Sequence, residues 1–403
     1  MKTDWETKML GDVCTFENGD RGSNYPSRSA QTRRGIPFIN AGHLTDDGID
    51  IQNLNFIPRE RFDLLRNGKI RAGDILFCLR GSLGKFASVG SLSEGAIASS
   101  LVIVRPGELV LREYILAYFR SDLCSDMISQ FKNGAAQPNL GAQSVKKFVI
   151  PIPPISEQRR IVGILDEAFK GIAVAKANAE KNVRHARALF ENYREAVFTQ
   201  HAPNWALKQL ADFATTQYGL SQPMNELGKG FKIFRMGEVQ DGRLVDTGRM
   251  KFADITEEEF QKYRLQSGDV LFNRTNSFEL VGKTGIFELE GDYCFASYLI
   301  RVLPDPHVML PAFLNYFMNS KRFQKSVKQK ASRSINQANI NATILSQESI
   351  PFPESLKEQR LIVAKLDSLR AEGSRLESLY QHKIAALEAL KKSLLYQAFT
   401  GNL

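Results

Sequence analysis

The sequence has little cysteine, and its few thiols are scattered. The four cysteines are Cys14, Cys78, Cys124 and Cys294. No two of them have the close spacing of a zinc cluster or of a disulfide framework. We therefore expect neither a structural metal site nor a set of disulfide bonds, and we expect thiols that are buried or otherwise unremarkable.

Long apolar runs are missing as well. No stretch approaches the roughly 20 apolar residues that a membrane-spanning helix needs. The N-terminal residues MKTDWETKML contain no apolar segment of the kind found in a signal peptide. These absences predict a cytoplasmic protein that has no membrane partner.

Motifs that carry catalysis are also absent. The five histidines lie far apart, without an H-x-x-x-H pair, and no Gly-x-Gly-x-x-Gly segment follows an expected strand. Gly282-Lys283-Thr284 matches only the end of a phosphate-binding loop, and the Asn/Asp-Pro-Pro-aromatic motif of amino-methyltransferases does not occur. We therefore expect no catalytic residue, no metal site and no cofactor bound by this chain, and a binding protein is favoured over an enzyme.

What the sequence does have is positive charge. Its 403 residues, enough for two to four domains, carry a formal net charge of +9. A soluble protein with this balance often binds a polyanion, and nucleic acid is the commonest one. A basic protein without such a partner has the same composition, so the charge alone leaves both interpretations open.

An internal repeat organises the whole sequence. Matches occur in the same order in both halves, from Trp5 and Trp205 near the start of each half to Phe198 and Phe399 near its end. Single matches mean little, but a long series in one order indicates a duplicated unit.

Each half opens with a part of mixed character. β-branched and aromatic runs such as Asp74–Cys78 and Ser100–Arg105 are typical of strands. A helical stretch is expected from about Leu111 to Phe131, followed by a Pro-rich break that keeps the chain extended. These patterns predict an α+β domain in each half.

A long helix is expected after each Pro-rich break. The stretch from Glu157 to Gln200 contains no proline, and a strict 4,3 spacing gives a heptad seam in both halves. The expected seam positions are Ile161, Leu165, Ala168, Ile172, Ala175, Ala179, Asn182, Ala186, Leu189, Tyr193 and Ala196, then Ile362, Leu366, Leu369, Gly373, Leu376, Tyr380, Lys383, Leu387, Leu390, Leu394 and Gln397.

The composition of the two seams favours pairing between the helices. The first seam contains mostly alanine and the second mostly leucine, so that small residues would meet large ones. An antiparallel pair would place one globular domain at each end of a two-helix rod, with pseudo-two-fold symmetry. The alternative is two amphipathic helices, each packed on a globular part.

The repeated motifs resemble those of one known family. Each half opens with Trp-x-x-Lys-x-Leu-x-Asp, contains Gly-Asp-Ile/Val-Leu-Phe and Gln-x-Asn, and enters the long helix through Glu-Gln-Arg-x-Ile-Val. In this order and duplication they resemble the specificity subunits of Type I restriction-modification systems, over essentially the whole chain. The resemblance implies target recognition domain 1 at residues 1–150, spacer helix 1 at 151–200, target recognition domain 2 at 201–350 and spacer helix 2 at 351–403.

The resemblance also implies a function and partners. Each target recognition domain would read one half of a split, asymmetric site in double-stranded DNA, and the antiparallel helices would set the gap between the half-sites. Two methyltransferase subunits, which carry S-adenosylmethionine and modify adenine N6, would bind the chain. Restriction (motor-nuclease) subunits that use ATP and magnesium would join them. The chain would supply recognition and no catalysis of its own.

Two other functions fit the residues. The chain could be a stand-alone sequence-specific DNA-binding protein, which would be soluble and bind DNA tightly by itself. It could also be an unrecognised enzyme with a coiled-coil arm, in which case the purified chain would methylate DNA alone.

Residues that contact DNA are expected in polar loops, where arginine and lysine bind phosphates and arginine, asparagine, glutamine and serine bind base edges. In the first half the candidates are Arg21, Asn24, Tyr25, Arg80, Ser82, Lys85, Lys132, Asn133, Gln137 and Asn139. In the second half they are Asn273, Arg274, Asn276, Ser277, Lys330, Arg333, Ser334, Asn336, Gln337 and Asn339.

Residues that differ between the halves are the better candidates for reading bases, because the two domains should read different sequences. Arg80-Gly-Ser82, set against Arg274-Thr-Asn276, fits this expectation. Gly73-Asp74 and Gly268-Asp269 are shared, so we interpret them as turn residues before a strand. The shared glutamine and asparagine of Gln-x-Asn are open to a structural role or to a phosphate contact.

Overall fold

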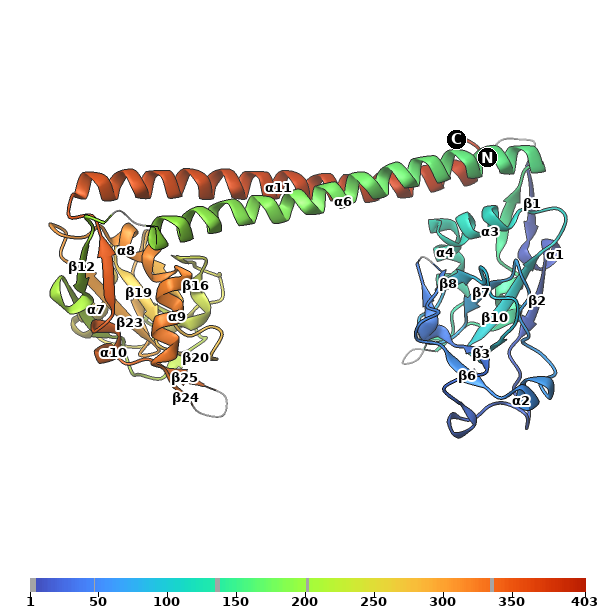
Figure 1. Ribbon diagram of the computed structural model, residues 1–403, viewed down its shortest axis with the longest axis horizontal. Helices are drawn as coiled ribbons and strands as arrows, with labels where there is room; N and C mark the ends of the chain where they lie inside the picture. Colours follow the sequence, from blue (N-terminus) through green and yellow to red (C-terminus); the bar gives the residue numbers. More distant parts are fainter. Residues whose placement is uncertain (1–4, 47, 135–137, 201–202, 334–336) are drawn as a thin grey trace. The chain divides into compact units, whose positions relative to one another are not determined.

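The structure is a computed structural model that describes residues 5–46, 48–134, 138–200, 203–333 and 337–403 (Figure 1). The chain divides into two compact units. Unit 1 comprises Met1–Glu180 and Gln381–Leu403, and unit 2 comprises Lys181–Tyr380. Each unit therefore contains one globular domain and a part of both long helices. The division into four domains at residues 1–150, 151–200, 201–350 and 351–403 stays a prediction.

The globular domain of unit 1 mixes short strands and short helices. Its strands are β1 (Glu6–Met9), β2 (Cys14–Asn18), β3 (Ile36–Ile39), β4 (Leu44–Thr45), β5 (Gly48–Ile49), β6 (Asn55–Ile57), β7 (Ile75–Cys78), β8 (Phe86–Ser88), β9 (Ala96–Ile97), β10 (Leu101–Pro106) and β11 (Val149–Ile152). Its helices are α1 (Leu10–Val13), η1 (Arg28–Ala30), η2 (Ala41–His43), α2 (Arg59–Asp63), α3 (Arg112–Phe119), α4 (Asp122–Phe131) and α5 (Ala142–Lys146).

The globular domain of unit 2 has a similar series. Its strands are β12 (Ala206–Gln209), β13 (Ala214–Tyr218), β14 (Met224–Asn225), β15 (Phe231–Phe234), β16 (Val239–Gln240), β17 (Arg243–Leu244), β18 (Lys251–Ala253), β19 (Val270–Asn273), β20 (Thr275–Asn276), β21 (Thr284–Ile286), β22 (Tyr293–Phe295), β23 (Leu299–Pro304), β24 (Ser332–Arg333), β25 (Ala338–Asn339) and β26 (Ser349–Phe352). Its helices are η3 (Leu210–Asp212), η4 (Met236–Glu238), α7 (Glu257–Tyr263), α8 (Pro311–Met318), α9 (Lys321–Gln329) and α10 (Ala342–Ser346).

The sheets of the two units have the same strand order. Unit 1 contains the sheet β2-β10-β7-β8, and unit 2 contains β13-β23-β19-β21, extended by β17 and β16. A second sheet runs β6-β3-β9 in unit 1 and β18-β15-β22 in unit 2, where β14 extends it. In both units its central strand pairs antiparallel on one side and parallel on the other. The sequence repeat is thus a repeat of topology, and the α+β expectation is confirmed.

Each domain begins and ends at one two-stranded sheet, which joins the domain to its long helix. Strand β1 pairs antiparallel with β11, and β12 pairs antiparallel with β26. Helix α6 (Ile155–Thr199) follows β11, and helix α11 (Leu356–Thr400) follows β26. The prolines in β11 and β26 keep this entry extended, because proline fixes its own φ and restricts the residue before it to extended conformations.

The glutamine of the Glu-Gln-Arg motif fixes the start of each long helix. Gln158 is fully buried; its Oε1 accepts a hydrogen bond from the N–H of Leu111 at 2.8 Å, and its Nε2 donates to the carbonyls of Leu109 and Pro153, both at 2.9 Å. Gln359 repeats all three contacts in unit 2. The glutamine of the motif therefore has a structural role, because a buried amide is stable only when its donors and acceptors are paired.

The long helices pair antiparallel within unit 1. Arg160 donates to the carbonyl of Leu403 at 2.6 Å, and Lys176 forms an ion pair with Glu388 at 2.6 Å. As the residue number rises along α6, the number of the contacting residue near or on α11 therefore falls. The first part of α6 thus lies along the last part of α11.

The same arrangement holds within unit 2. Arg187 forms an ion pair with Glu377, and the guanidinium of Arg370 lies 5.0 Å from the ring centre of Phe190. The last part of α6 therefore lies antiparallel to the first part of α11, as the seams predicted. The expected meeting of small and large residues is only partly seen. A Cβ on Gly373 would lie 3.1 Å from the carbonyl oxygen of Ala186, so two small residues meet there.

Of the 22 expected seam positions, seven are buried, twelve are partly buried and three, Leu189, Lys383 and Leu390, are exposed. Ile161, Leu165 and Leu366 are at most 2% exposed, whereas Leu189 is 46% exposed and Leu390 is 48% exposed. The prediction of a strict 3.5-residue period was wrong at these two leucines. A straight helix has 3.6 residues per turn, so its buried face drifts away from a 3.5 pattern.

The end of each helix packs on a globular domain instead. Leu395, Ala398 and Phe399 belong to the core of unit 1, and Phe198 belongs to the core of unit 2. The two interpretations of the helices are therefore both correct in part: the helices pair with each other, and their ends are anchored in the domains.

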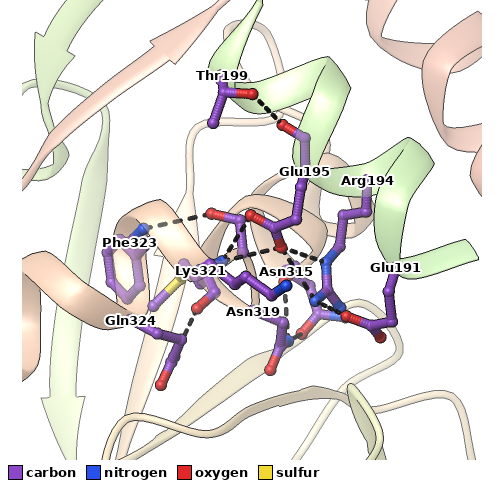
Figure 2. Close-up of polar contacts among 11 residues, drawn as sticks. Glu191, Arg194, Glu195, Thr199, Asn315, Asn319, Lys321, Phe323 and Gln324 are labelled. Atoms are coloured by element: carbon purple, nitrogen blue, oxygen red, sulfur yellow. Dashed lines mark hydrogen bonds and ion pairs between the residues drawn. The ribbon is translucent and has the colours of Figure 1, made fainter. Parts of the chain in front are cut away.

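In unit 2, polar contacts join the end of α6 to the start of α9 (Figure 2). Both carboxylate oxygens of Glu195 accept from the backbone N–H of Lys321 at 2.9 Å, and Arg194 forms an ion pair with Glu195 at 3.3 Å. Asn319, which follows α8, donates to the carbonyl of Thr284 at 3.0 Å. The contacts hold the domain of unit 2 to its own part of α6.

The remaining expectations have mixed outcomes. The four cysteines are buried and unbonded, as expected, and burial raises the pKa of Cys14 and Cys124 to about 12. The expected single helical stretch is two helices, because Ser121 caps the start of α4 and accepts from the N–H of Cys124. Among the described residues, no helix is long and apolar enough to span a membrane.

The shared Gly-Asp pairs are turn residues before a strand, as expected. Gly73 and Gly268 have φ angles of +86° and +94°, a conformation that glycine adopts without strain. Asp74 accepts from the backbone N–H of Arg71 at 2.7 Å and so closes the turn before β7.

Candidate nucleic-acid interface

In unit 1, the candidate residues after β7 lie beside those after α4. Arg80 and Asn133 both form isolated bridges with Asn139, and the backbones of Asn133 and Asn139 exchange two hydrogen bonds of 2.9 and 2.8 Å. The N–H of Leu140 donates to the carbonyl of Leu79 at 2.9 Å. Two loops that are distant in sequence thus form one surface, on which Arg80 and Asn133 are exposed.

In unit 2, the equivalent residues form a small sheet. Strands β20, β24 and β25 are arranged in the order β20-β25-β24, and Asn339 in the central strand pairs with a residue of each neighbour. This sheet lies at the end of unit 2 away from α11 (Figure 1). The structure therefore brings the candidates after β19 and those after α9 together.

Backbone hydrogen bonds identify the residues that are equivalent in the two units. The N–H of Leu79 donates to the residue before β10 at 2.8 Å, and the N–H of Arg274 donates to the residue before β23 at 3.0 Å. Leu79 is therefore the equivalent of Arg274, and Arg80 is the equivalent of Thr275. The predicted alignment of Arg80 with Arg274 was therefore wrong by one residue. It paired two residues of the same type, whereas the residue that is equivalent to Arg274 is Leu79, which is buried in the core.

Arg274 makes several contacts within the protein. It donates from Nη1 to the carbonyl of Ser297 and from Nη2 to Oδ1 of Asn339, both at 3.2 Å. Its guanidinium lies 4.9 Å from the ring centre of Tyr218. Its Nε is buried and has no hydrogen-bond partner among the described residues. These contacts fix Asn339, whose Nδ2 donates to Thr275 at 2.8 Å.

Arg21 occupies the corresponding place in unit 1. Its Nη2 donates to the carbonyl of Ser99 at 3.4 Å. Ser99 lies two residues before β10, as Ser297 lies two residues before β23. Equivalent carbonyls thus bind an arginine in both units, although the arginines come from different positions in the sequence.

The neighbours of Arg21 have contacts with the scaffold. Asn24 donates from Nδ2 to the carbonyl of Leu64 at 3.0 Å. The ring of Tyr25 packs edge-to-face on Phe38, with the ring centres 5.9 Å apart. Both side chains are partly buried, so only a part of each remains for a ligand.

Asn273 differs from the other candidates because it is fully buried. It is the last residue of β19, and its side-chain oxygen and nitrogen have no hydrogen-bond partner among the described residues. The equivalent residue of unit 1, Cys78, is also fully buried. In this position the side chain of Asn273 exposes no atom to DNA.

The remaining candidates are spread around these loops. Lys330 forms an ion pair with Glu348 at 2.7 Å, and the guanidinium of Arg333 lies 3.7 Å from the ring centre of Phe278. The other exposed candidates are Ser82, Lys132 and Gln337, and the other partly buried ones are Lys85, Asn276 and Ser277. Gln137, Ser334 and Asn336 lie outside the described residues.

Three exposed arginines of unit 1, Arg28, Arg33 and Arg34, were not among the candidates predicted from the sequence. They lie between β2 and β3, away from the motifs that the two halves share. The signal that could have identified them is a run of positive charge without nearby acidic residues, because no aspartate or glutamate occurs from Arg21 to Thr45.

Comparison with known proteins agrees with this architecture. The Type I restriction enzyme EcoKI specificity subunit of Escherichia coli (strain K12) is 26% identical over 391 residues, which cover 91% of this chain and 82% of that protein. The StySPI specificity subunit of Salmonella potsdam is 25% identical, covering 99% of this chain and 89% of its own.

Solved structures share the fold. A chain from a study of complex assembly and conformational transition of the type I R-M system is 21% identical, with a TM-score of 0.79 over 100% of this chain and 99% of its own. The HsdS subunit from Thermoanaerobacter tengcongensis is 20% identical, with a TM-score of 0.66 over 100% of this chain and 98% of its own.

The family itself is identified by a match that covers both halves. The Type I restriction modification DNA specificity domain matches residues 2–182 and again residues 203–388. The duplicated match agrees with the repeated topology of the two units. The chain belongs to the family of Type I restriction-modification DNA specificity proteins, and its role is the recognition of DNA sequence.

Proposed function

We propose that each unit reads one half of a bipartite, asymmetric site in double-stranded DNA. The observation that carries this proposal is that the units share one scaffold but differ at equivalent positions of the candidate interface. Arg80, which is exposed in unit 1, is replaced by the partly buried Thr275 in unit 2. Because base edges are distinguished by donor and acceptor pattern, different side chains on one scaffold select different sequences.

The proposed partners are two methyltransferase subunits, which bind S-adenosylmethionine and modify adenine N6, and restriction subunits that use ATP and magnesium. The names of the relatives support an assembly of this kind. In this assembly the chain supplies recognition and positions the enzymes, and it catalyses no reaction itself.

The helices offer surfaces for such partners. In unit 2, Leu189 and Leu379 are 46% and 52% exposed, and in unit 1 Val174 and Leu390 are 63% and 48% exposed. A polypeptide that docks along the paired helices would remove these side chains from water. Unit 2 also contains a cleft of about 710 Å³, lined by residues of both long helices and of its domain.

An exchange of one domain tests the proposal. Residues 1–150 are replaced by the corresponding part of another family member, and methylated adenines are mapped in cells that also produce the methyltransferase subunit. We expect one half-site to change and the other, read by residues 201–350, to stay the same. A change of both half-sites at once would contradict independent reading.

A second experiment tests the absence of catalysis. The purified chain is incubated with DNA and labelled S-adenosylmethionine, with the complete complex as the positive control. We expect label in DNA only from the complex. Transfer of label by the chain alone would make it an enzyme and would overturn the proposal.

A further inference from the structure

An acid-free segment of unit 1 carries four arginines. Between Asp20 and Asp46 there is no aspartate or glutamate, whereas Arg21, Arg28, Arg33 and Arg34 all occur there. We call residues 28–34, which precede β3, the arginine loop. Three of the four arginines lie in it.

The backbone of the arginine loop is held in place. The N–H of Thr32 donates to the carbonyl of Phe56 at 2.9 Å, and the hydroxyl of Thr32 donates to the carbonyl of Arg34 at 2.8 Å. Gly35 has a φ of +142°, and a Cβ there would lie only 2.5 Å from the carbonyl oxygen of Ile57. The loop is thus packed closely against β6, and its side chains are presented from a fixed base.

The guanidinium groups of the loop have no charge partner. Arg28, Arg33 and Arg34 are exposed, and they form no ion pair or side-chain hydrogen bond with the described part of the chain. By contrast, Arg59 of the same unit forms an ion pair with Glu94 at 2.6 Å. Like charges on one exposed loop repel one another weakly in water, and an anion nearby would relieve that repulsion.

The equivalent segment of unit 2 is different. It connects β14 to β15, and the charges around it are paired: Lys229 with Asp254 at 3.4 Å, and Lys251 with Glu226 at 3.1 Å. The scaffold therefore does not require an arginine-rich loop before this strand. The loop is a property of unit 1 alone.

The acid-free segment that contains the arginine loop begins beside the candidate interface of unit 1. Strands β3 and β6 lie at the end of unit 1 away from α6 (Figure 1). Arg21, at the start of the acid-free segment, contacts Ser99, and the following residue Ser100 accepts from the N–H of Leu79 beside Arg80. The side chain of Arg21 thus connects the start of this segment to the loops that are proposed to read bases.

We propose that the arginine loop binds the phosphate backbone of DNA and gives unit 1 phosphate contacts that the equivalent segment of unit 2 lacks. The inference rests on the proposed function and adds an unequal division of phosphate contacts. A guanidinium matches two phosphate oxygens with two parallel N–H donors. Phosphate contacts position the protein without reading sequence, so the loop should contribute affinity and not selectivity.

The test measures DNA binding by the complex of the chain with its methyltransferase subunit at several salt concentrations from about 50 to 200 mM. The variant is R28Q/R33Q/R34Q, and R28K/R33K/R34K is the matched control that keeps the charge. For each phosphate that the protein no longer neutralises, the slope of log K against log salt should fall by about 0.9. We expect the glutamine variant to lower the slope by about 2 to 3, equally on target and non-target DNA, and the lysine variant to keep it.

The outcomes separate this inference from the proposed function. If the parent complex prefers its target and the glutamine variant has the same salt slope, the inference is overturned and the proposed function stands. If the variant instead loses the methyltransferase subunit, the loop binds protein and the inference is again overturned. If the parent complex shows no preference for any sequence, the proposed function itself fails.

Discussion

The two units make the same arginine–carbonyl contact with arginines from different positions in the sequence. In both, a backbone carbonyl two residues before a central strand accepts from a guanidinium, but Arg21 supplies it in unit 1 and Arg274 in unit 2. The first arginine follows β2 and the second follows β19. The guanidinium occupies the same location in both units, but it comes from different positions in the sequence. A sequence alignment therefore pairs arginines that are not structurally equivalent.

A second comparison concerns the contacts between the two long helices. In unit 1, Lys391 of α11 lies 5.4 Å from the ring centre of Phe169 on α6. In unit 2, Arg370 of α11 lies 5.0 Å from the ring centre of Phe190 on α6. In both units a cation of α11 packs on a ring of α6, although the repeat exchanges the two helices between the units. Phe169 corresponds to Arg370 and Phe190 to Lys391 when the two helices are aligned from their first residues, so the contacts occupy equivalent positions and the ring and the cation have changed places.

The largest expected effect comes from charges placed in the shared helix pair. Leu165→Lys in unit 1 and Leu366→Lys in unit 2 each bury an unpaired charge, which costs about 3–5 kcal/mol. Leu390→Lys is the control, because that side chain is 48% exposed and the change should cost less than about 0.5 kcal/mol. Calorimetric unfolding measures all three. Equal stability of the three variants would show that the seam is not buried in solution.

The next largest effect tests whether the scaffold is truly equivalent in the two units. Gln158→Met and Gln359→Met keep side-chain length but leave one N–H and two carbonyls without partners, each costing about 1 kcal/mol or more. We expect similar losses of unfolding free energy in both variants. Gln143→Met, on an exposed position of α5, should change little. A large loss in one unit only would mean that the motif has different roles in the two halves.

The sequence predicted the parts of the fold that follow from local patterns. The duplication, the strands at Asp74–Cys78 and Ser100–Arg105 and the antiparallel helices are visible in periodicity and in the order of motifs. The exposed Leu189 and Leu390 could not be found in this way, because a straight helix with 3.6 residues per turn rotates its buried face away from a 3.5-residue pattern.

The candidate site was predictable only as a set of loops. The sequence indicated that residues after Phe77 and residues after Phe131 are polar, and the structure brings them together through Asn139. It did not indicate that Asn273 is buried or that Arg274 holds Asn339, because these contacts join strands that are far apart in the chain. The equivalence of Leu79 and Arg274 likewise depends on backbone pairing.

The third prediction sharpens the contrast between Arg80 and Arg274. Arg80 is exposed, so Arg80→Ala should leave the unfolding free energy within about 0.5 kcal/mol and relax one base pair of a half-site by about 1–3 kcal/mol. Arg274→Ala removes two hydrogen bonds and should cost about 1–2 kcal/mol of stability. Unfolding and binding to single-base variants of the target are measured for both.

The outcome that would reverse this contrast is specific. If Arg274→Ala unfolds like the parent and relaxes one base pair, then Arg274 leaves Ser297 and Asn339 to contact a base. A uniform loss on all sequences, with a shallower salt slope, would mark either arginine as a phosphate contact instead.

The smallest expected effect concerns acid, and it arises from one difference between two similar networks around a buried aspartate. In unit 1, Arg105 bonds to Asp74 at 2.8 Å and to Glu17; in unit 2, Arg301 bonds to Asp269 at 3.0 Å and to Gln217. Only the network of unit 1 has a second carboxylate.

Burial by itself raises the pKa of Glu17, but hydrogen bonds from Arg105 and from the backbone N–H of Gly68, with the charge of Arg105, leave the pKa below its ordinary value. A carboxyl whose pKa is lowered by folding stabilises the protein fully above the pKa of the unfolded chain, and this stability is lost as the pH falls through the folded pKa. Unit 1 should therefore lose stability below the ordinary glutamate pKa of about 4.3, and Glu17→Gln should remove this part of the loss. Hydrogen exchange of unit 1 amides in parent and variant, followed from neutral to acid pH, measures the difference, and Gln217→Glu should introduce it in unit 2. If the parent and Glu17→Gln respond to acid identically, the Glu17–Arg105 contact adds no pH-dependent stability, and the two networks are equivalent despite their different residues.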